Sequence, residues 1–428
     1  MNADCGPSGR VVVTGMGIVS AAGCGVAAFT TALREGRSGA RALGGEGRLA
    51  AIPVAKLVDF NLDSALAAQG DLPSDVVLRA RRAARRSPLP VQAAVTAAAE
   101  AWQMAGLAGA SPEDIGVVVA GQNLNQKYDF DVRAKFSERP EYVSPAYAAH
   151  FLDTDHVGTL SEVFAIRGEG LTVGGASASG NVGLLQGLRL VRSGEVKACM
   201  VVGALMDLSE IELSALESLG ALSNGGAEAA RACRPFDNAR NGFLYGQAGA
   251  CVILEPEKAA RDRGARIWGE LRSGSLVLDG NRSTDPSVEG EVRAMAIALE
   301  RAGITADQVD YVNAHGTASR LGDEAEIAAL DRVFGAASPG PRVNSTKAIT
   351  GHTLSAAGVV EAIATLVQMN EGFLHANINL DEPMRSRVRL VGTRGEPAQV
   401  RIALSNSFGF GGINTSIVLA KSEGGSWE

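Results

Sequence analysis

The sequence lacks long hydrophobic runs, contains few aromatic residues and carries little net charge. No segment reaches the roughly 18 apolar residues needed to span a bilayer, and Met1 to Arg10 shows no basic stretch followed by an apolar one. We therefore expect no membrane partner and no secretory signal. The formal net charge of −7 argues against nucleic acid as a partner.

Cysteine is also sparse, and its spacing carries no motif. The five cysteines form no CxxC pair and no metal-ligand spacing: Cys5, Cys24, Cys199, Cys233 and Cys251. We interpret Cys199 and Cys251, which lie inside apolar runs, as buried thiols. Neither disulfides nor a metal are expected, and a reducing cytoplasm fits this pattern.

What is present is a long chain with the composition of a packed α/β enzyme. It has 428 residues, of which 46% are hydrophobic, and 52 glycines. Strand-like runs alternate with helical patterns, which predicts a mostly parallel sheet, with residues 121–156 as an irregular excursion. We expect an N-terminal half, 1–240, and a C-terminal half, 241–428. Predicted helices include 26–35, 90–105, 181–191, 287–302, 323–334 and 354–369; predicted strands include 115–120, 198–202, 249–254, 309–314, 400–405 and 414–419.

The most informative segment is Gly174-Gly175-Ala176-Ser177-Ala178-Ser179-Gly180. It joins an apolar run ending at Val173 to a helical pattern beginning at Asn181. Such a small-residue elbow presents a hydroxyl at a helix N-terminus, where unpaired backbone N–H groups can receive a developing oxyanion.

Three further segments carry histidine, lysine and glycine in notable patterns: Val312-Asn-Ala-His315-Gly-Thr317, Asn344-Ser-Thr-Lys347-Ala-Ile-Thr-Gly-His352 and Ser405-Asn-Ser-Phe-Gly-Phe410-Gly-Gly-Ile-Asn414. Together with the elbow, in this order and spacing, they resemble the β-ketoacyl synthases of the thiolase superfamily over about residues 10 to 420. The resemblance implies an α/β thiolase fold, two βαβ-type halves in a five-layered α/β/α/β/α arrangement. It also implies a homodimer in which Ala198 to Val202 pairs across a two-fold axis.

The resemblance implies roles for individual residues. His315 and His352 would hydrogen-bond a thioester oxygen and stabilise an enolate. Either histidine taken alone would more readily be interpreted as a satisfied core residue. Lys347 would orient the site through a buried ion pair with Glu361; otherwise both would be surface charges.

The glycine-rich loop and the segment after His315 would complete the site. Phe410, beside Gly409, resembles the gating phenylalanine of the family, and its N–H would form an oxyanion hole with that of Ser177. The alternative is a core aromatic in a connecting loop. Thr317 and Ser319 would line the arm of a pantetheine carrier. A phosphate-binding loop is a poor interpretation of 409–412, because no strand-to-helix context with basic residues follows.

The family's elbow carries a cysteine that takes up an acyl chain, and here Ser177 replaces it. An alcohol is far harder to ionise than a thiol, so we expect a poor acyl acceptor that retains the decarboxylation apparatus. The stretch from Gly174 to Asn181 resembles the freestanding Cys-to-Ser ketosynthase-like proteins of polyketide β-branching cassettes, which convert malonyl to acetyl carrier protein, the donor for a downstream HMG-synthase-like enzyme. We therefore predict a malonyl-acyl carrier protein decarboxylase, with no diffusible cofactor and with substrate held on the carrier's phosphopantetheine arm.

Three alternatives remain open at this point. The chain could be an ordinary condensing synthase whose active-site cysteine has been replaced by serine, an acyl-serine transferase, or a non-catalytic partner subunit. Gln247 stands where the family usually has an acidic residue, which favours a divergent branch over a single substitution in a standard enzyme.

A cluster of positive charge indicates how an acidic carrier protein could dock. Five arginines fall within eight residues: Arg79, Arg81, Arg82, Arg85 and Arg86. Charge complementarity of this kind speeds encounter and fixes orientation. A solvated helical face is an equally good interpretation.

Overall fold

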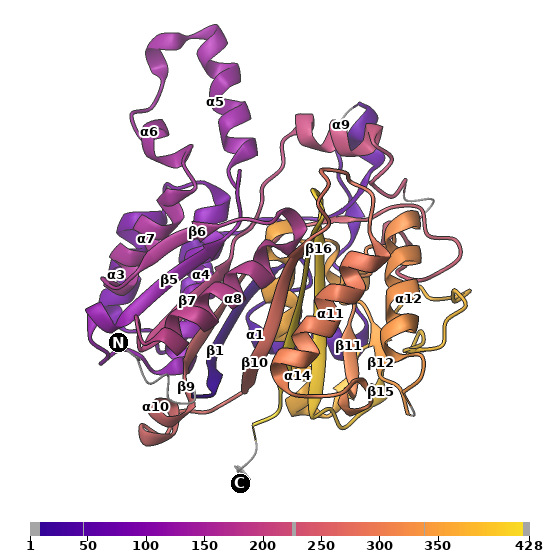
Figure 1. Ribbon diagram of the computed structural model, residues 1–428. Coiled ribbons are helices and arrows are strands. Elements are labelled where there is room, and N and C mark those ends of the chain that lie inside the picture. Colours follow the sequence, from indigo (N-terminus) through magenta and orange to yellow (C-terminus); the bar gives the residue numbers. More distant parts are fainter. Residues whose placement is uncertain (1–8, 46, 225–227, 338, 423–428) are drawn as a thin grey trace.

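The fold is built around one mixed, 12-stranded β-sheet (Figure 1). The computed structural model describes residues 9–45, 47–224, 228–337 and 339–422. Strand β2 (Gly23–Cys24) pairs with β1 beside the main path. Along the main path the strands run in the order β14 (Arg389–Leu390), β12 (Arg342–Asn344), β11 (Tyr311–Asn313), β16 (Ile402–Gly409), β17 (Ile413–Ala420), β10 (Gly269–Leu278), β1 (Val11–Ser20), β9 (Ala248–Pro256), β7 (Ala198–Gly203), β5 (Ile115–Ala120) and β6 (Gly170–Val173).

The sheet repeats one pattern of pairing twice. In one part β5 lies parallel to β6 and β7, β7 is antiparallel to β9, and β9 is antiparallel to β1. In the other, β11 lies parallel to β12 and β16, β16 is antiparallel to β17, and β17 is antiparallel to β10. The two parts join where β1 and β10 pair antiparallel. The division into 1–240 and 241–428 stays a prediction. The expectation that Ala198 to Val202 pairs across a two-fold axis is wrong, because β7 already pairs with β5 on one edge and with β9 on the other.

The expectation of a mostly parallel sheet is wrong for the middle of the molecule. Strands β16 and β17 are joined by residues 410–412 alone, with Gly411 at φ +89° and Gly412 at φ +71°. So short a connection can join only antiparallel neighbours, since a parallel pair needs a crossover of a dozen or more residues. Parallel pairing is confined to the outer strands of each part.

Helices fill the space between the two parts of the sheet and cover their outer faces. Helices α8 (Ser179–Ser193) and α14 (Ala357–Glu371) pack together and contact strands of both parts. A Cβ on Gly180 would come within 2.6 Å of the Gly358 nitrogen, so the absence of side chains allows this close approach. Helix α4 (Leu89–Ala105) covers β1 and β9, while α11 (Val288–Ala302) covers β10 and β17 and packs on α12 (Arg320–Phe334).

The segment 121–156 is more regular than its sequence predicts. It contains α5 (Gln126–Glu138), α6 (Tyr147–His150) and the start of α7 (Thr154–Phe164). Figure 1 shows α5 and α6 projecting from the body of the molecule. Helix α5 has no buried residue, and its sequence lacks the apolar periodicity from which a helix is predicted. Its turns are linked instead by the i,i+4 ion pairs Lys127–Asp131 and Arg133–Asp129.

The cysteines of the described residues are all free thiols. Cys199 and Cys251 are buried thiols as predicted, and burial raises the pKa of Cys199 to about 12. Cys24 and Cys233 are also free thiols, whereas Cys5 lies outside the described residues. No helix in the described ranges is both long enough and apolar enough to cross a membrane.

Candidate active site

Ser177 lies on a tight turn between the end of β6 and the start of α8. The preceding residue, Ala176, has φ +48°, a left-handed conformation that costs energy for a residue with a Cβ. Ser179 holds the turn, because its Oγ accepts from the Gly175 N–H at 2.9 Å and donates to the Ala176 carbonyl at 2.7 Å. Gly409, at the end of β16, packs so closely that a Cβ there would overlap the Gly175 carbonyl.

The Ser177 hydroxyl faces an imidazole. Its Oγ lies 2.9 Å from Nε2 of His352. The other ring nitrogen of His352, Nδ1, accepts from the Leu354 N–H at 3.4 Å, which leaves the proton of the neutral ring on Nε2. His352 therefore donates to Ser177 and directs an N–H toward the space around the serine.

His315 is held in the matching tautomer by Lys347. The Lys347 Nζ donates to the His315 carbonyl at 2.6 Å and lies 3.4 Å from its Nδ1. An ammonium group only donates, so Nδ1 must accept and the ring proton sits on Nε2. The His315 and His352 rings are 5.4 Å apart between centroids and nearly perpendicular. Two imidazole N–H donors thus converge on one site.

The electrostatics keep both imidazoles uncharged. Desolvation, followed by the nearby charge of Lys347, lowers the pKa of His315 and of His352 well below 6.5. Lys347 is 1% exposed and pairs with Glu361, which is also buried. Burial raises the pKa of Glu361 to about 7 against the opposing effect of Lys347. The predicted Lys347–Glu361 pair is therefore present and buried, not at the surface.

The backbone around the elbow offers donors of its own. Among the described residues, the N–H groups of Ser177 and Phe410 have no acceptor. Gly409 brings the two segments together, since a Cβ on it would lie 3.3 Å from the Ser177 nitrogen. This geometry suits the predicted oxyanion hole.

The histidines, the serine and the glycine-rich loop line one cavity of about 710 Å³. Thr317 and Ser319 also line it, and their hydroxyls are hydrogen-bonded to each other at 2.9 Å. Phe410 lines it too and is 45% exposed, so it is not a core aromatic. The sequence motifs therefore converge on a single space, as the resemblance implies.

Three residues at the site were not singled out from the sequence. Glu326 of α12 accepts hydrogen bonds from the backbone N–H groups of His315 and Gly316. Phe408 is buried, and its ring lies 5.6 Å from that of His315. Phe243 contacts His352 edge to face at 5.2 Å. Of these three residues, only Glu326 could have been noticed in the sequence, because it is a glutamate on the apolar face of a predicted helix.

The arginine cluster is only partly available for docking. Arg81 and Arg85 both face Asp63, and Arg79 binds Asp75 and the Val163 carbonyl. Arg82 and Arg86 are exposed and, within the described part of the chain, have no ion-pair partner. The cluster lies on α3 (Ser74–Ala84) and just after its end. Figure 1 places α3 beside α7 and well away from α12.

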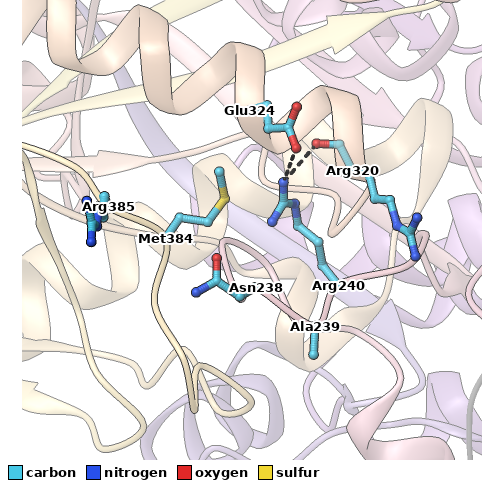
Figure 2. Close-up of a pocket in the computed structure, with 7 residues that line it drawn as sticks. All are labelled: Asn238, Ala239, Arg240, Arg320, Glu324, Met384 and Arg385. Carbon is cyan, nitrogen blue, oxygen red and sulfur yellow. Dashed lines mark hydrogen bonds and ion pairs between the residues drawn. The ribbon is translucent and has the colours of Figure 1, made fainter.

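A second cavity, of about 580 Å³, adjoins the first. Figure 2 shows Arg240 reaching the Arg320 carbonyl at 3.1 Å and Glu324 at 2.9 Å. Arg320 lines both cavities, but the second contains neither the serine nor the histidines. The larger of these two cavities, which contains the serine and the histidines, is therefore the candidate active site.

Comparison with known proteins agrees with this geometry. Residues 8–260 match the β-ketoacyl synthase N-terminal domain and residues 269–381 its C-terminal domain. The malonyl-ACP decarboxylase PksF of polyketide biosynthesis in Bacillus subtilis (strain 168) is 38% identical, with 97% of each chain covered. The 3-oxoacyl-[acyl-carrier-protein] synthase 2 of Vibrio harveyi is 32% identical over 96% of this chain and 98% of that protein.

A solved structure extends the likeness to three dimensions. The ishigamide ketosynthase/chain length factor shares 30% sequence identity with a TM-score of 0.84, covering 97% of this chain and 100% of that chain. With α8 and α14 layered between the two parts of the sheet, this likeness confirms the predicted thiolase fold. The chain belongs to the β-ketoacyl synthase family.

Proposed function

We propose that this protein decarboxylates malonyl-acyl carrier protein to acetyl-acyl carrier protein in polyketide biosynthesis. The observation that carries the proposal is the pairing of two neutral imidazole N–H donors with an alcohol where the family has a thiol. The similarity to PksF, a protein named for this reaction, supports it.

The donors suit an enolate. When the bond between the malonyl carboxylate and its α-carbon breaks, carbon dioxide leaves and the electron pair moves onto the thioester oxygen. His315 and His352 would each donate a hydrogen bond to that oxygen as its charge develops, a contribution of about 2.7–4 kcal/mol for one such donor. Because both rings are neutral, they stabilise the enolate without first giving it a proton.

The serine is poorly equipped as a nucleophile. A serine is normally activated by a histidine that accepts its proton and is itself oriented by a carboxylate. Here His352 presents an N–H to Ser177, and its Nδ1 is occupied by the Leu354 N–H and not by a carboxylate. Condensation through an acyl-serine would therefore be slow, while loss of carbon dioxide would not need the serine to ionise.

The carrier would enter from the mouth of the cavity. Thr317 and Ser319 would line its phosphopantetheine arm, and Phe410 would gate the chamber. Exposed Arg82 and Arg86 would attract the acidic carrier. Figure 1 places α3 well away from α12, which contributes to the cavity lining, so these arginines would serve a carrier that bridges two subunits. A homodimer, a cytoplasmic location and a downstream HMG-synthase-like enzyme belong to the same proposal.

Intact-protein mass spectrometry tests the reaction. We expect a malonyl-loaded acyl carrier protein to lose the mass of carbon dioxide when incubated with the protein, with no mass added to the enzyme. The control is a double variant, His315→Ala with His352→Ala, which should leave the malonyl group intact. An unchanged malonyl carrier with wild-type protein contradicts the proposal, and a stable adduct on Ser177 indicates an acyl-serine transferase.

A further inference from the structure

Glu291 is a buried acid that the mechanism described so far does not use. It lies on α11, is 1% exposed, and lines the same cavity as Ser177, His315 and His352. Its Oε2 has no hydrogen-bond partner among the described residues. A buried carboxylate without a partner is costly, so an acid in this setting favours its neutral, protonated form.

The groups around Glu291 are acidic or uncharged. Asp279, at the end of β10, fills the space beside α11, since a Cβ on Gly290 would overlap its carboxylate. From α12, the charges of Asp323 and Glu326 raise the pKa of Glu291. The remaining neighbours of α11, strands β16 and β17, contribute the amides of Asn406 and Asn414, of which Asn414 donates to Asp279 at 2.9 Å.

No cation from these elements balances a charge on Glu291. Burial, and then repulsion from Glu326, Asp279 and Asp323, raises its pKa well above the usual range. These surroundings therefore favour the protonated carboxylic acid over the carboxylate. Glu291 differs in this from Glu361, which has Lys347 as a partner.

Neighbours of Glu291 are also linked to the residues that position His315. Asn414, which lines the cavity, pairs across the β-hairpin with Phe408, and the Phe408 ring contacts His315. Glu326, a second neighbour of Glu291, holds the backbone of His315. Glu291 and the two imidazoles therefore line the same cavity, and neighbours of Glu291 also position His315.

A decarboxylase needs such an acid in a way that a condensing enzyme does not. In condensation the enolate carbon attacks an acyl group, whereas in simple decarboxylation that carbon must take a proton. We propose that Glu291 supplies this proton, directly or through one water in the cavity. This inference rests on the proposed decarboxylation.

The step balances as a proton transfer. The Glu291 O–H bond breaks, a C–H bond forms at the former α-carbon, and the thioester carbonyl is restored as the enolate electrons move to carbon. Glu291 is left as a carboxylate with three acidic neighbours, which favours its rapid reprotonation from solvent at the mouth of the cavity.

The test is the pH profile of Glu291→Gln, a variant of the same shape that has no acidic proton. With malonyl-N-acetylcysteamine as substrate, the wild-type kcat should fall as pH rises through the pKa of Glu291. The variant should lose about 10²–10⁴-fold in kcat at neutral pH and should lack that basic limb. KM should change little. Glu289→Gln, on the exposed side of α11 where Glu289 pairs with Arg332, is the matched control and should behave as wild type.

A second measurement covers the case in which bond cleavage alone limits kcat. Without the acid, the enolate lives longer and can recapture carbon dioxide, so the variant should exchange labelled carbon dioxide into the malonyl thioester more than wild type. If Glu291→Gln kept the kcat, the basic limb of the pH profile and the carbon dioxide exchange of the wild type, the assignment of Glu291 would be overturned. Absence of decarboxylation by wild type would instead overturn the proposed function and this inference with it.

Discussion

His352 Nε2 lies 2.9 Å from Ser177 Oγ, and the Leu354 N–H fixes the ring so that this nitrogen is the donor. The serine is thus an acceptor of the histidine's hydrogen bond rather than a proton source for it. In the proposed function, this contact would separate the two reactions of a condensing enzyme, because it would leave the enolate donors intact and the nucleophile inactive.

The first prediction concerns the serine itself. Ser177→Ala should retain decarboxylation of malonyl-N-acetylcysteamine within about tenfold, because one neutral hydrogen bond is worth about 0.5–1.5 kcal/mol. Steady-state kinetics would check this. A loss as large as that of the histidine variants would show that the hydroxyl takes part in the chemistry.

The histidines should behave in the opposite way. His315→Ala and His352→Ala should each lower kcat by about 10²–10³-fold, since each removes one donor to the developing oxyanion. His150→Gln is the control, because His150 pairs with Asp155 outside the cavity. If either alanine variant kept full kcat, its imidazole would not stabilise the enolate.

Lys347 should matter for both stability and protonation. Lys347→Met leaves Glu361 buried without its partner, which should cost about 3–5 kcal/mol of unfolding free energy. The pKa of Glu361 is already raised, so the loss should grow as pH rises from 6 to 9 and the acid ionises. Urea unfolding at the two pH values measures this.

A double variant separates the ion pair from packing effects. Glu361→Gln added to Lys347→Met should recover much of the lost stability, because no unpaired charge remains. Strictly additive losses would contradict the buried pair. Removal of the ammonium should also let the pKa of His315 and His352 rise toward 6.5, which NMR titration of the imidazoles can follow.

His156 gives a prediction on stability alone. Neither ring nitrogen has a hydrogen-bond partner in the described structure, and burial lowers its pKa to about 4 against the opposing effect of Asp155 and Asp153. Below pH 6.5 the unfolded chain binds a proton that the folded chain does not. The wild type should therefore lose up to about 1.4 kcal/mol per pH unit between 6.5 and 4 relative to His156→Leu. A difference that stays constant with pH, measured by urea unfolding, would refute this.

Within the arginine cluster, Arg82 and Arg86 are exposed and have no ion-pair partner in the described part of the chain, so they are its candidates for steering a carrier. Replacing both with glutamate should lower kcat/KM for malonyl-loaded carrier by about tenfold or more at low salt and spare malonyl-N-acetylcysteamine. The effect should shrink as salt rises. Arg394→Glu, at another exposed position, is the control. Equal losses on both substrates would remove the docking assignment.

The elbow could be predicted from its own small residues, whereas the roles of both histidines and the lysine were predicted from the resemblance of their motifs to a known family. The helix at 126–138 was not, because its turns are joined by ion pairs and it has no apolar stripe. Nor could the sequence show that Asp63, eighteen residues before Arg81, neutralises part of the arginine cluster. Glu291 becomes notable only when Asp279, which follows β10, and Asp323 and Glu326 of α12 are brought around it.

The central claim is that Ser177 uncouples decarboxylation from condensation, and a competition experiment tests it most directly. Wild type and Ser177→Cys would each be given an acyl-loaded carrier together with a malonyl-loaded carrier, and the products would be followed by intact-protein mass spectrometry. We predict that wild type forms acetyl carrier with no acyl-enzyme and no β-ketoacyl product, whereas the cysteine form becomes acylated and condenses. An acylated Ser177 or a β-ketoacyl product from wild type would contradict the claim.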